Sequence, residues 1–593
     1  MEAVPNTSDV IIEGLESWGV DTVFGLPGDG INGLMEALRQ REGRIRFVLV
    51  RHEEAAAFMA TAYAKLTGRL GVCIATSGPG AIHLLNGLYD AKLDGAPVLA
   101  ITGQTYSDLI GSRYQQEVDM VRLFDDVSVY NVGVTSPEHA RSVVDLACRA
   151  ALARRGVAHL NLPIDVQVEP MRGGGSEKNV PGHTRPHEVD LAVRPPAREV
   201  ERAARLLNEG RRVVLLVGRG AYGAHEELLE LARRLQAPIA KALLGKDVLP
   251  DAHPHVLGGV GHLGTLPAQR ALEGCDTLLM VGTSFPYMEH LPKPGSVRGI
   301  QVDSDATRLG LRYPVDVGLV GDARATLQEL LPLIEPRATS DWLAGLQGEM
   351  RDWRGLMATR AESPEAPIKP QLVAQEVGRR LRDDAIVTCD SGTITTWAAR
   401  HIDIRQGQRF ALSGNLASMA PGLPYAIAAQ IAYPERQVVA FIGDGGLLML
   451  ASELSVAAHY RLPIKVVVVK NGSLGMIKWE QLVFLGNPSY GVELPPVDLA
   501  MVARGLGVKG SHVEEPQELG ATLDAAFAHD GPALIECTVD PFEPPHPPKA
   551  TLEDALRVAK ALSRGEPHAG RIALTLFRDK LDDLGREPAR RRT

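Results

Sequence analysis

A carboxylate and a side-chain amide stand 27 positions apart in this chain, each directly after a segment expected to form a strand. Asp444 follows the apolar run 437–443, and Asn471 follows the run 465–470. When a right-handed crossover joins two neighbouring parallel strands, their carboxyl ends lie at the same edge of the sheet. An isolated Gly-Asp-Gly is more often a turn with a capping Asp, but a cap needs no distant Asn. We therefore expect Asp444 and Asn471 to lie close together.

The residues around Asp444 favour a diphosphate held through a divalent cation. Gly443, Gly445 and Gly446 have no side chains, so the backbone can approach a ligand closely there. A helix that begins after these glycines offers free N–H groups and the positive end of its dipole to phosphate. A carboxylate, an amide oxygen and a main-chain carbonyl are suitable ligands for Mg²⁺.

The composition is that of an ordinary protein with several domains. At 593 residues the chain exceeds the size of a single hydrophobic core, and three to four domains are expected. Hydrophobic residues make up 45% and charged residues 23%, which is usual for a globular protein. The net charge of −9 is spread along the chain, with no basic block before 589–592. These features argue against nucleic-acid binding through a charged face.

Cysteine usage and the apolar runs favour a cytoplasmic location. The five cysteines occur singly, without the spacing of metal ligands, and are expected to be buried free thiols: Cys73, Cys148, Cys275, Cys389 and Cys537. The N-terminus lacks the basic start and long apolar run of a signal peptide. Every apolar run falls short of the roughly 20 residues that a membrane-spanning helix needs.

Strand-length apolar runs alternate with longer amphipathic segments, which predicts an α/β fold built from doubly wound parallel sheets. Two stretches rich in Pro, Gly or charge, 168–196 and 335–367, interrupt this alternation and are interpreted as linkers. The chain is accordingly divided into three α/β domains and a charged tail, at 1–185, 190–340, 365–545 and 546–593.

The Gly-Asp-Gly motif and its spacing from Asn471 resemble the signature of the thiamine diphosphate enzymes that decarboxylate 2-oxo acids. The family carries Asn-Asn at the second position, whereas this chain has Lys470 before Asn471. The resemblance implies that Mg²⁺ is held by Asp444, Asn471 and a main-chain oxygen of Ser473. It also implies that Gly392 and Thr393, in the segment 390–401, hold the diphosphate of the cofactor.

In this family a carboxyl group of the first domain assists the amino group of the cofactor's pyrimidine ring, and the resemblance assigns that role to Glu53. Taken alone, Glu53 is more often a helix-capping acid. The segment 76–104 resembles the pyruvate oxidases and acetolactate synthases, and the resemblance to the oxidases implies that His83 is an active-site residue. Gln116, in the segment 113–117, matches a polar active-site position of the family. Gln115 stands where the family usually has a Phe beside its flavin.

The segment 416–430 resembles the part of the family that bends the cofactor. The resemblance implies that Met419 wedges between the two rings and that the carbonyl of Ala417 accepts a hydrogen bond from the amino group. Without the resemblance, core filling is the simpler interpretation of Met419.

Several features indicate the pyruvate oxidase and pyruvate:quinone oxidoreductase branch, close to the acetolactate synthases. Glu480 stands four residues after Met476, as in the oxidases, and Trp479 stands one position earlier than the Trp of the synthases. The middle domain resembles the flavin-binding domain of the oxidases, which implies FAD contacts at Gly218, Gly220, Thr283, Asp303 and Asp322. Other members with the same fold bind no flavin.

Three functions remain open from the sequence. The first is oxidation of pyruvate to acetate and CO₂, with FAD passing electrons to quinone or oxygen; the second is carboligation to acetolactate; the third is a cofactor-binding paralogue without turnover. Because Glu53 and Asp444 lie in different domains, we expect the site to form between two chains, in a homodimer at least, and the resemblance implies a tetramer. In the tail, Ile572, Leu576 and Phe577 lie near one helical face. The resemblance to the quinone-reducing enzymes implies peripheral membrane contact through a segment at this position, and packing on the protein itself is the alternative interpretation.

Overall fold

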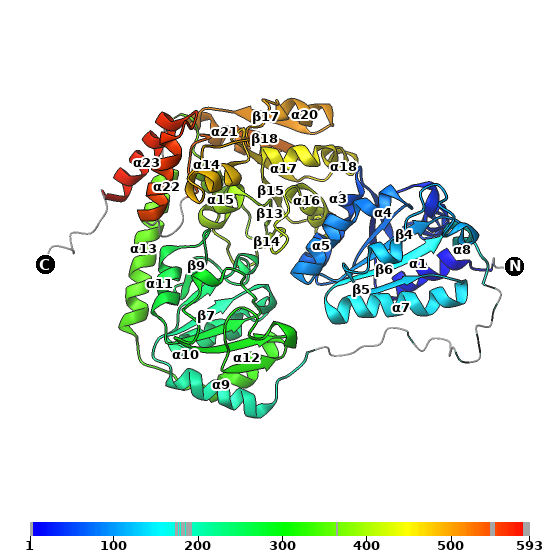
Figure 1. The fold of residues 1–593 in the computed structure, drawn as a ribbon, viewed down its shortest axis with the longest axis horizontal. Helices are drawn as coiled ribbons and strands as arrows, with labels where there is room; N and C mark the ends of the chain where they lie inside the picture. The colour runs from blue at the N-terminus through cyan, green and yellow to red at the C-terminus, as the bar shows by residue number, and fades with distance from the viewer. Residues whose placement is uncertain are drawn as a thin grey trace.

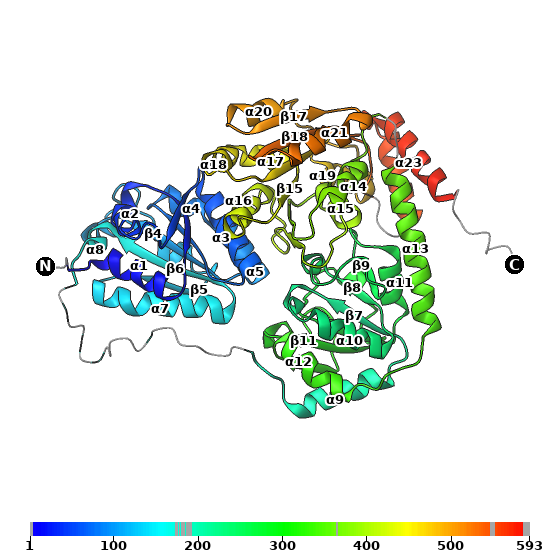
Figure 2. The ribbon, with the colours of Figure 1, turned by 180° about the vertical axis from the view of Figure 1, so that it is seen from behind.

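The computed structural model describes residues 4–171, 192–362, 366–545 and 552–584, together with positions 173, 176, 178 and 184. It contains three parallel six-stranded sheets, one in each of three α/β domains (Figure 1). The first domain lies to one side of the molecule, and the middle and third domains stack on the other side (Figures 1 and 2).

The first domain has strand order β2-β1-β3-β4-β6-β5. Its strands are β1 (Thr22–Leu26), β2 (Arg46–Leu49), β3 (Gly71–Ala75), β4 (Val98–Gln104), β5 (Ser128–Gly133) and β6 (Val157–Pro163). Its helices are α1 (Thr7–Ser17), α2 (Asn32–Arg39), α3 (Glu53–Thr67), α4 (Pro79–His83), α5 (Leu85–Asp94), α6 (Met120–Leu123), α7 (Pro137–Arg154) and α8 (Ile164–Gln167). Along β4, Val98 and Ala100 join one apolar core while Leu99 and Ile101 join another, because successive side chains point to opposite faces. Helices therefore cover both faces of the sheet.

The middle domain has strand order β12-β11-β10-β7-β8-β9. Its strands are β7 (Val213–Val217), β8 (Ile239–Lys241), β9 (Val256–Gly259), β10 (Thr277–Val281), β11 (Arg298–Asp303) and β12 (Val317–Val320). Its helices are α9 (Ala197–Glu209), α10 (His225–Leu235), α11 (Leu266–Gly274) and α12 (Ala323–Leu330). Numbered within the domain and read from β9, this order is 3-2-1-4-5-6, the arrangement of dinucleotide-binding folds.

The third domain has strand order β14-β13-β15-β16-β18-β17. Its strands are β13 (Ile386–Cys389), β14 (Arg409–Ala411), β15 (Val438–Gly443), β16 (Lys465–Lys470), β17 (Lys509–Val513) and β18 (Ala533–Thr538). Its helices are α14 (Pro370–Arg380), α15 (Thr393–His401), α16 (Gly422–Ala432), α17 (Asp444–Met449), α18 (Leu454–His459), α19 (Gly475–Val483), α20 (Leu499–Gly505) and α21 (Pro516–Phe527). The first and third domains thus share one topology, although no sequence repeat marks it.

One apolar core joins the first and third domains, since α3 packs against α16. The ring of Phe58 meets the ring of Tyr425 edge-on across this contact. Beside it, the buried ammonium of Lys65 donates hydrogen bonds to Asp90, Asp94 and Tyr425. The two domains are therefore held by an extensive, specific interface.

Two segments differ from the sequence-based expectation. Most of the predicted linker 335–367 is a 21-residue helix, α13 (Asp341–Ala361), which packs against α11 and α14. The helix expected after Gly446 is not continuous: this stretch forms α17, a short 3₁₀ helix at Ala451–Glu453 and α18, with a break at Leu450. The irregular backbone of Leu450, at φ −131° and ψ 32°, interrupts the helical hydrogen bonding.

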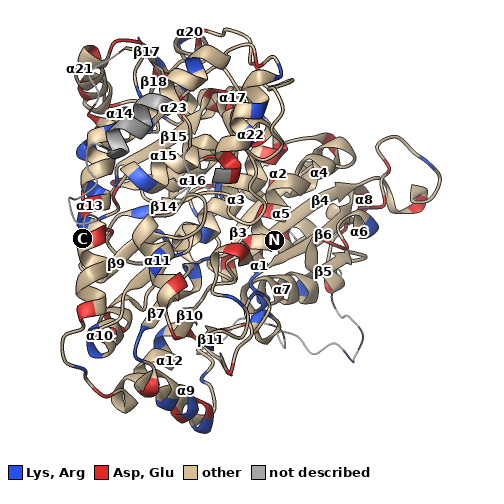
Figure 3. Cartoon of the chain, turned by 60° about the vertical axis from the view of Figure 1, so that its left-hand side comes forward, with Lys and Arg blue, Asp and Glu red and all other residues tan. Residues whose placement is uncertain are grey.

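The C-terminal segment forms α22 (Leu552–Ser563) and α23 (Ala569–Leu584), and both views place α23 beside α13 (Figures 1 and 2). Basic and acidic residues are interspersed over the elements seen in Figure 3. All five cysteines are buried free thiols, as predicted. Among the described residues, no helix combines the length and hydropathy that crossing a bilayer requires.

Candidate active site

Asp444 and Asn471 lie at neighbouring strand ends, as predicted. β15 and β16 pair in parallel with Gly443 opposite Val469, so both side chains emerge at one edge of the third sheet. Asp444 Oδ2 accepts a hydrogen bond from the N–H of Gly472 at 2.9 Å. Asn471 Oδ1 accepts one from the N–H of Ser473 at 3.1 Å. Each side chain is therefore held in place by the backbone of the β16–α19 loop.

These residues fit a hard cation. Asp444 is buried, and this burial raises the pKa of its carboxyl group, a cost that a bound cation would offset. The Oγ atom of Ser473 is buried without a hydrogen-bond partner among the described residues. A carboxylate, an amide and the hydroxyl of Ser473, with a main-chain carbonyl oxygen that also accepts the N–H of Gly475, form the type of ligand set that Mg²⁺ prefers.

Lys470, the departure from the family signature, takes part in a different interaction. Its ammonium donates to the carbonyl of Val497 at 2.6 Å and pairs with Glu536 at 2.5 Å. Glu536 in turn accepts the N–H of Ala500. The replacement of the first Asn by Lys therefore builds an ion pair with β18, and its positive charge partly opposes the upward effect of burial on the pKa of Asp444.

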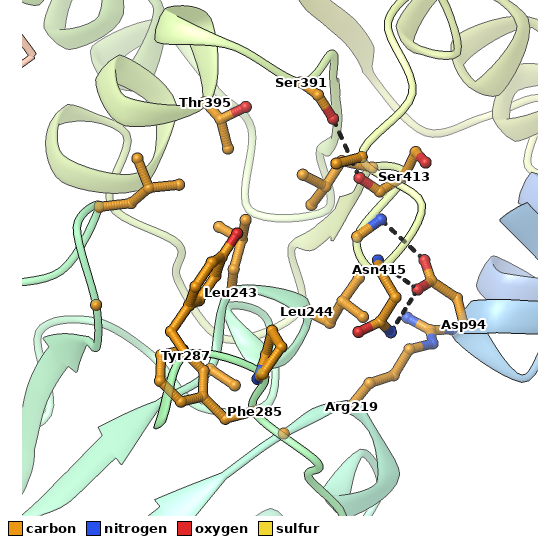
Figure 4. Close-up of a pocket in the computed structure, with 18 of the residues that line it drawn as sticks. Asp94, Arg219, Leu243, Leu244, Phe285, Tyr287, Ser391, Thr395, Ser413 and Asn415 are labelled. Atoms are coloured by element: carbon orange, nitrogen blue, oxygen red, sulfur yellow. Dashed lines mark hydrogen bonds between the residues drawn. The ribbon is translucent and has the colours of Figure 1, made fainter. Parts of the chain in front are cut away.

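One cavity of about 2840 Å³ extends from this sheet edge to the middle domain. Figure 4 shows part of it, with Leu243, Leu244, Phe285 and Tyr287 on the middle-domain side and Ser391 and Ser413 on the third-domain side. The predicted residues that line it are Gly218, Gly220, Thr283, Asp303, Asp322, Gly392, Thr393, Ala417, Met419, Gly443, Asp444, Gly445, Gly446, Asn471, Ser473, Met476 and Glu480.

The floor of the cavity is formed where the order of the third sheet reverses, between β13 and β15. Gly392 has a φ of +118°, which a side chain would strain. A Cβ at Gly446 would lie only 2.0 Å from Oδ2 of Asp390, so this position requires glycine for packing. Asp390 is a site residue that the sequence interpretation missed, although it stands at the end of β13. Burial raises the pKa of its carboxyl group to about 7.

Ala417 and Met419 lie on the opposite wall. Ala417 has a φ of +56°, an uncommon conformation for a residue with a side chain. Met419 is only half-buried, lines the cavity, and places its Cε 3.3 Å from the Cβ position of Gly445. This exposure to the cavity disfavours simple core filling.

At the other end, the cavity meets the switch point of the middle sheet between β7 and β10. Gly220 donates its N–H to the carbonyl of Gly282, and a Cβ on Gly218 or Gly220 would collide with Gly282. These glycines therefore allow two loops to pack together at the crevice where dinucleotides bind in such sheets. Asp322 caps α12 by accepting the N–H of Ala325, and Asp303 accepts the N–H of Asp305.

Arginines concentrate positive charge on this part of the cavity wall. Burial lowers the pKa of Arg155, and repulsion from Arg308 lowers it further. Burial likewise lowers the pKa of Arg219; attraction by Asp247 opposes this shift, and repulsion from Arg409 and Arg155 adds to it. Figure 4 shows Arg219 extending toward Asp94. Because the charges repel each other, an anionic group in the cavity would be stabilised here.

The three predicted residues of the first domain lie together, but apart from this cavity. Glu53 Oε2 lies 2.9 Å from His83 Nδ1, and Gln116 Oε1 accepts a hydrogen bond from Ser77. Glu53 is buried at the start of α3, whereas the cavity is lined by the last residues of that helix, 64–67. At the usual rise, Lys65 lies about 18 Å along the helix from Glu53. Within one chain, therefore, Glu53 does not line the cavity.

The C-terminal segment closes one side of the cavity, which the sequence interpretation did not foresee. Val558 and Leu576 contribute to its lining. Ile572 is fully buried and packs with Trp479 of α19. Of the predicted apolar face of the tail, Ile572 and Leu576 thus pack against their own chain. The side chain of Phe577 lies outside the described residues. This arrangement gives the predicted membrane contact no support.

Comparisons with known proteins agree with this three-part architecture. Three family models match the chain: Thiamine pyrophosphate enzyme, N-terminal TPP binding domain over residues 5–123, central domain over 200–330, and C-terminal TPP binding domain over 390–537. A protein described as thiamine pyrophosphate-containing, YdaP of Bacillus subtilis (strain 168), is 42% identical over 92% of this chain and 93% of its own.

Two further relatives have different activities in their names. Pyruvate oxidase of Lactiplantibacillus plantarum is 34% identical over 92% of this chain and 90% of its own. Acetolactate synthase isozyme 2 large subunit of Escherichia coli (strain K12) is 34% identical over 93% of this chain and 99% of its own. Overall identity therefore does not separate the oxidase from the synthase.

Proposed function

The chain belongs to the thiamine pyrophosphate enzyme family, and on this premise we propose that it oxidatively decarboxylates a 2-oxo acid, pyruvate, with FAD as its electron carrier. The observation that carries this proposal is the single cavity that joins the Asp444–Asn471 site to the dinucleotide-type switch point. Two cofactors bound at its ends would share one enclosed space. In the overall reaction pyruvate and water yield acetate and CO₂, and the acceptor gains two electrons.

Thiamine diphosphate and Mg²⁺ fit the third-domain end. Asp444, Asn471 and Ser473 would hold the metal, and the turn at Gly392 and Thr393 would receive the diphosphate. When bound, thiamine diphosphate supplies the carbon that adds to a 2-oxo acid and stabilises negative charge after decarboxylation. Met419 restricts the space beside Gly445.

Glu53 can take part in this chemistry only if a second copy of the chain supplies it. Its carboxylate would hold a proton at the pyrimidine ring, but it does not line the cavity of its own chain. The segments that carry His83 and Gln116 expose Ile82, Tyr106, Ile110 and Tyr114, which suits contact with another subunit. We therefore propose a homodimer at least, and a tetramer by resemblance, in which Glu53 of one subunit faces the cofactor of the other.

FAD fits the middle-domain end by charge and shape. The arginine-rich wall around Arg155, Arg219 and Arg308 suits a diphosphate, and the half-exposed ring of Tyr287 with Leu243 and Leu244 suits a flat ring system. Glu480 and Met476 lie on α19 between the two ends of the cavity, where substrate would bind. Quinone or oxygen is the proposed final acceptor.

The absorption spectrum of the purified protein tests this function. We expect a flavin band that bleaches on anaerobic addition of pyruvate and returns with a soluble quinone or with oxygen, while acetate and CO₂ accumulate. The competing function is acetolactate synthesis, favoured by the 34% identity to the synthase named above. A protein that forms acetolactate while its flavin stays oxidised, or that contains no flavin, would contradict the oxidase proposal.

A further inference from the structure

A carboxylate of the third domain holds the turn that precedes Glu53. Glu453 Oε1 accepts hydrogen bonds from the backbone N–H groups of Arg51 and His52, each at 3.0 Å. Glu453 is fully buried, although it belongs to an acidic residue type that is rarely buried without a partner. Its second oxygen, Oε2, has no hydrogen-bond partner among the described residues. Such a costly buried group calls for a functional or structural reason.

The turn that Glu453 holds determines where α3 begins. β2 ends at Leu49, and α3 starts at Glu53, so the two bound N–H groups lie in the short connection between them. The N–H of Leu49 also donates to the hydroxyl of Tyr460, and the Arg51 guanidinium donates to Ser455. The third-domain segment 453–460 therefore forms hydrogen bonds with this connection at several points. α18, which is part of this segment, lies at the boundary with the first domain (Figures 1 and 2).

The same short stretch carries the metal site. α17 begins at Asp444, and Glu453 follows nine residues later at the end of the next 3₁₀ helix. The break at Leu450 separates the Asp444 turn from Glu453, and the Glu453 carboxylate contacts the connection before α3. Glu53 is the first residue of α3, so a shift of residues 51–52 moves its carboxylate directly.

We propose that Glu453 is a positioning residue, which fixes the start of α3 and so aims the Glu53 carboxylate at the cofactor. This inference rests on the proposed function, because it assumes that Glu53 acts on bound thiamine diphosphate. A misplacement of about 1 Å at a catalytic group can cost about a hundredfold in rate. Loss of the Glu453 carboxylate should therefore reduce turnover, while the metal and diphosphate ligands remain in place.

Three substitutions separate positioning from folding. Glu453→Ala removes both hydrogen bonds, and Glu453→Asp withdraws the carboxylate by one methylene while keeping its charge. Glu453→Gln keeps an acceptor oxygen and is the rescue variant. Ser455→Ala is the matched control, since it removes the hydrogen bond to the exposed Arg51 side chain and a local one to the carbonyl of Ser452, but leaves both bonds of the Glu453 carboxylate in place.

The measurements use the full-length protein loaded with Mg²⁺ and thiamine diphosphate. We expect Glu453→Ala and Glu453→Asp to lower kcat at least tenfold, with KM and cofactor affinity changed less than threefold. The exchange of the C2 proton of bound thiamine diphosphate with D₂O should slow by the same factor. Glu453→Gln and Ser455→Ala should stay within threefold of the wild type in both assays.

The exchange assay also distinguishes the two hypotheses. The exchange assay needs no substrate. A wild-type protein that exchanges this proton but does not oxidise pyruvate would therefore contradict the proposed reaction. The role of Glu453 could still be tested in that case, because it is measured by the exchange rate. Unchanged exchange per folded holoenzyme in Glu453→Asp and Glu453→Ala would overturn the positioning role. The same conclusion would follow if Glu453→Gln were as slow as Glu453→Ala, because the acceptor oxygen would then be irrelevant. If Glu453→Ala does not fold, Glu453→Asp alone decides.

Discussion

Gly446→Ala should damage the metal site through packing alone. The added Cβ would lie 2.0 Å from Oδ2 of Asp390, about 1.4 Å closer than the 3.4 Å at which ordinary contact begins. Asp390 is buried, and its other oxygen accepts the N–H of Gly422 at 2.7 Å. Either Asp390 turns away and loses that hydrogen bond, or the turn that carries Asp444 moves.

Both adjustments have a predictable cost. Overpacking a well-packed site destabilises by about 1–3 kcal/mol, and loss of a hydrogen bond to a charged group by about 1.5–3 kcal/mol. For a domain of this size, about 3 kcal/mol corresponds to a fall of roughly 6–12 °C in Tm. If the turn moves instead, Asp444 shifts relative to Asn471, and Mg²⁺-dependent binding of thiamine diphosphate should weaken by about 10–100-fold.

Gly443→Ala is the matched comparison, because a Cβ there meets nothing within 4 Å. Its φ of −90° also suits alanine. We expect its apo-protein Tm to equal that of the wild type, even where a bound cofactor is crowded. Thermal unfolding of the apo-proteins, followed by calorimetric titration with Mg²⁺ and thiamine diphosphate, measures both effects. A Gly446→Ala protein with wild-type Tm and cofactor affinity, or a Gly443→Ala protein with an equally low Tm, would refute the reasoning.

Three further variants test other parts of the structure. Glu53→Gln should lower kcat at least about a hundredfold, the usual contribution of a proton-transfer group, while Mg²⁺–thiamine diphosphate affinity stays within a few-fold; unchanged turnover would support a paralogue whose chemistry does not use this acid. Burial raises the pKa of the Asp390 carboxyl group to about 7. The preference of the folded protein for the protonated carboxyl group therefore stabilises it fully below about pH 4, and this stabilisation is lost as the pH rises to 7. Asp390→Asn should therefore have a higher Tm than the wild type at pH 8 and lose most of that advantage by pH 5; a pH-independent difference would contradict this assignment. Ile572→Asp places a charge against Trp479, so it should lower Tm and shift tryptophan emission to the red, whereas unchanged emission would show that α23 is not seated there.

Local sequence patterns predicted the third-domain strands well. The runs 437–443 and 465–470 correspond to β15 at 438–443 and β16 at 465–470. A continuous run of β-branched and aliphatic residues between turn signals is typical of a strand buried on both faces. Because parallel neighbours bring their carboxyl ends together, the placement of Asp444 beside Asn471 followed from the pattern and was confirmed.

Residues whose roles depend on contacts between segments far apart in the chain were not accessible to the same reasoning. Asp390 and Glu453 look like ordinary helix-flanking acids in the sequence, and only their burial and their hydrogen bonds to distant N–H groups distinguish them. The stretch that contains α13 was interpreted as a linker because it interrupts the alternation of strand-length runs and amphipathic segments, whereas the packing of α13 on α11 and α14 depends on contacts between segments far apart in the chain. The position of α22 and α23 over α19 likewise depends on contacts between segments far apart in the chain.

The sequence by itself determined the three α/β units, the proximity of Asp444 to Asn471 and the family, since each depends on local periodicity or on short motifs at strand ends. Only the tertiary structure decided which of these motifs share a cavity. It joined the third-domain site to the middle-domain switch point and left Glu53 on a separate face. The physical reason is that a strand end specifies the edge of its own sheet, whereas the meeting of two sheet edges depends on side-chain packing between α3 and α16 and on the helices that bridge the domains.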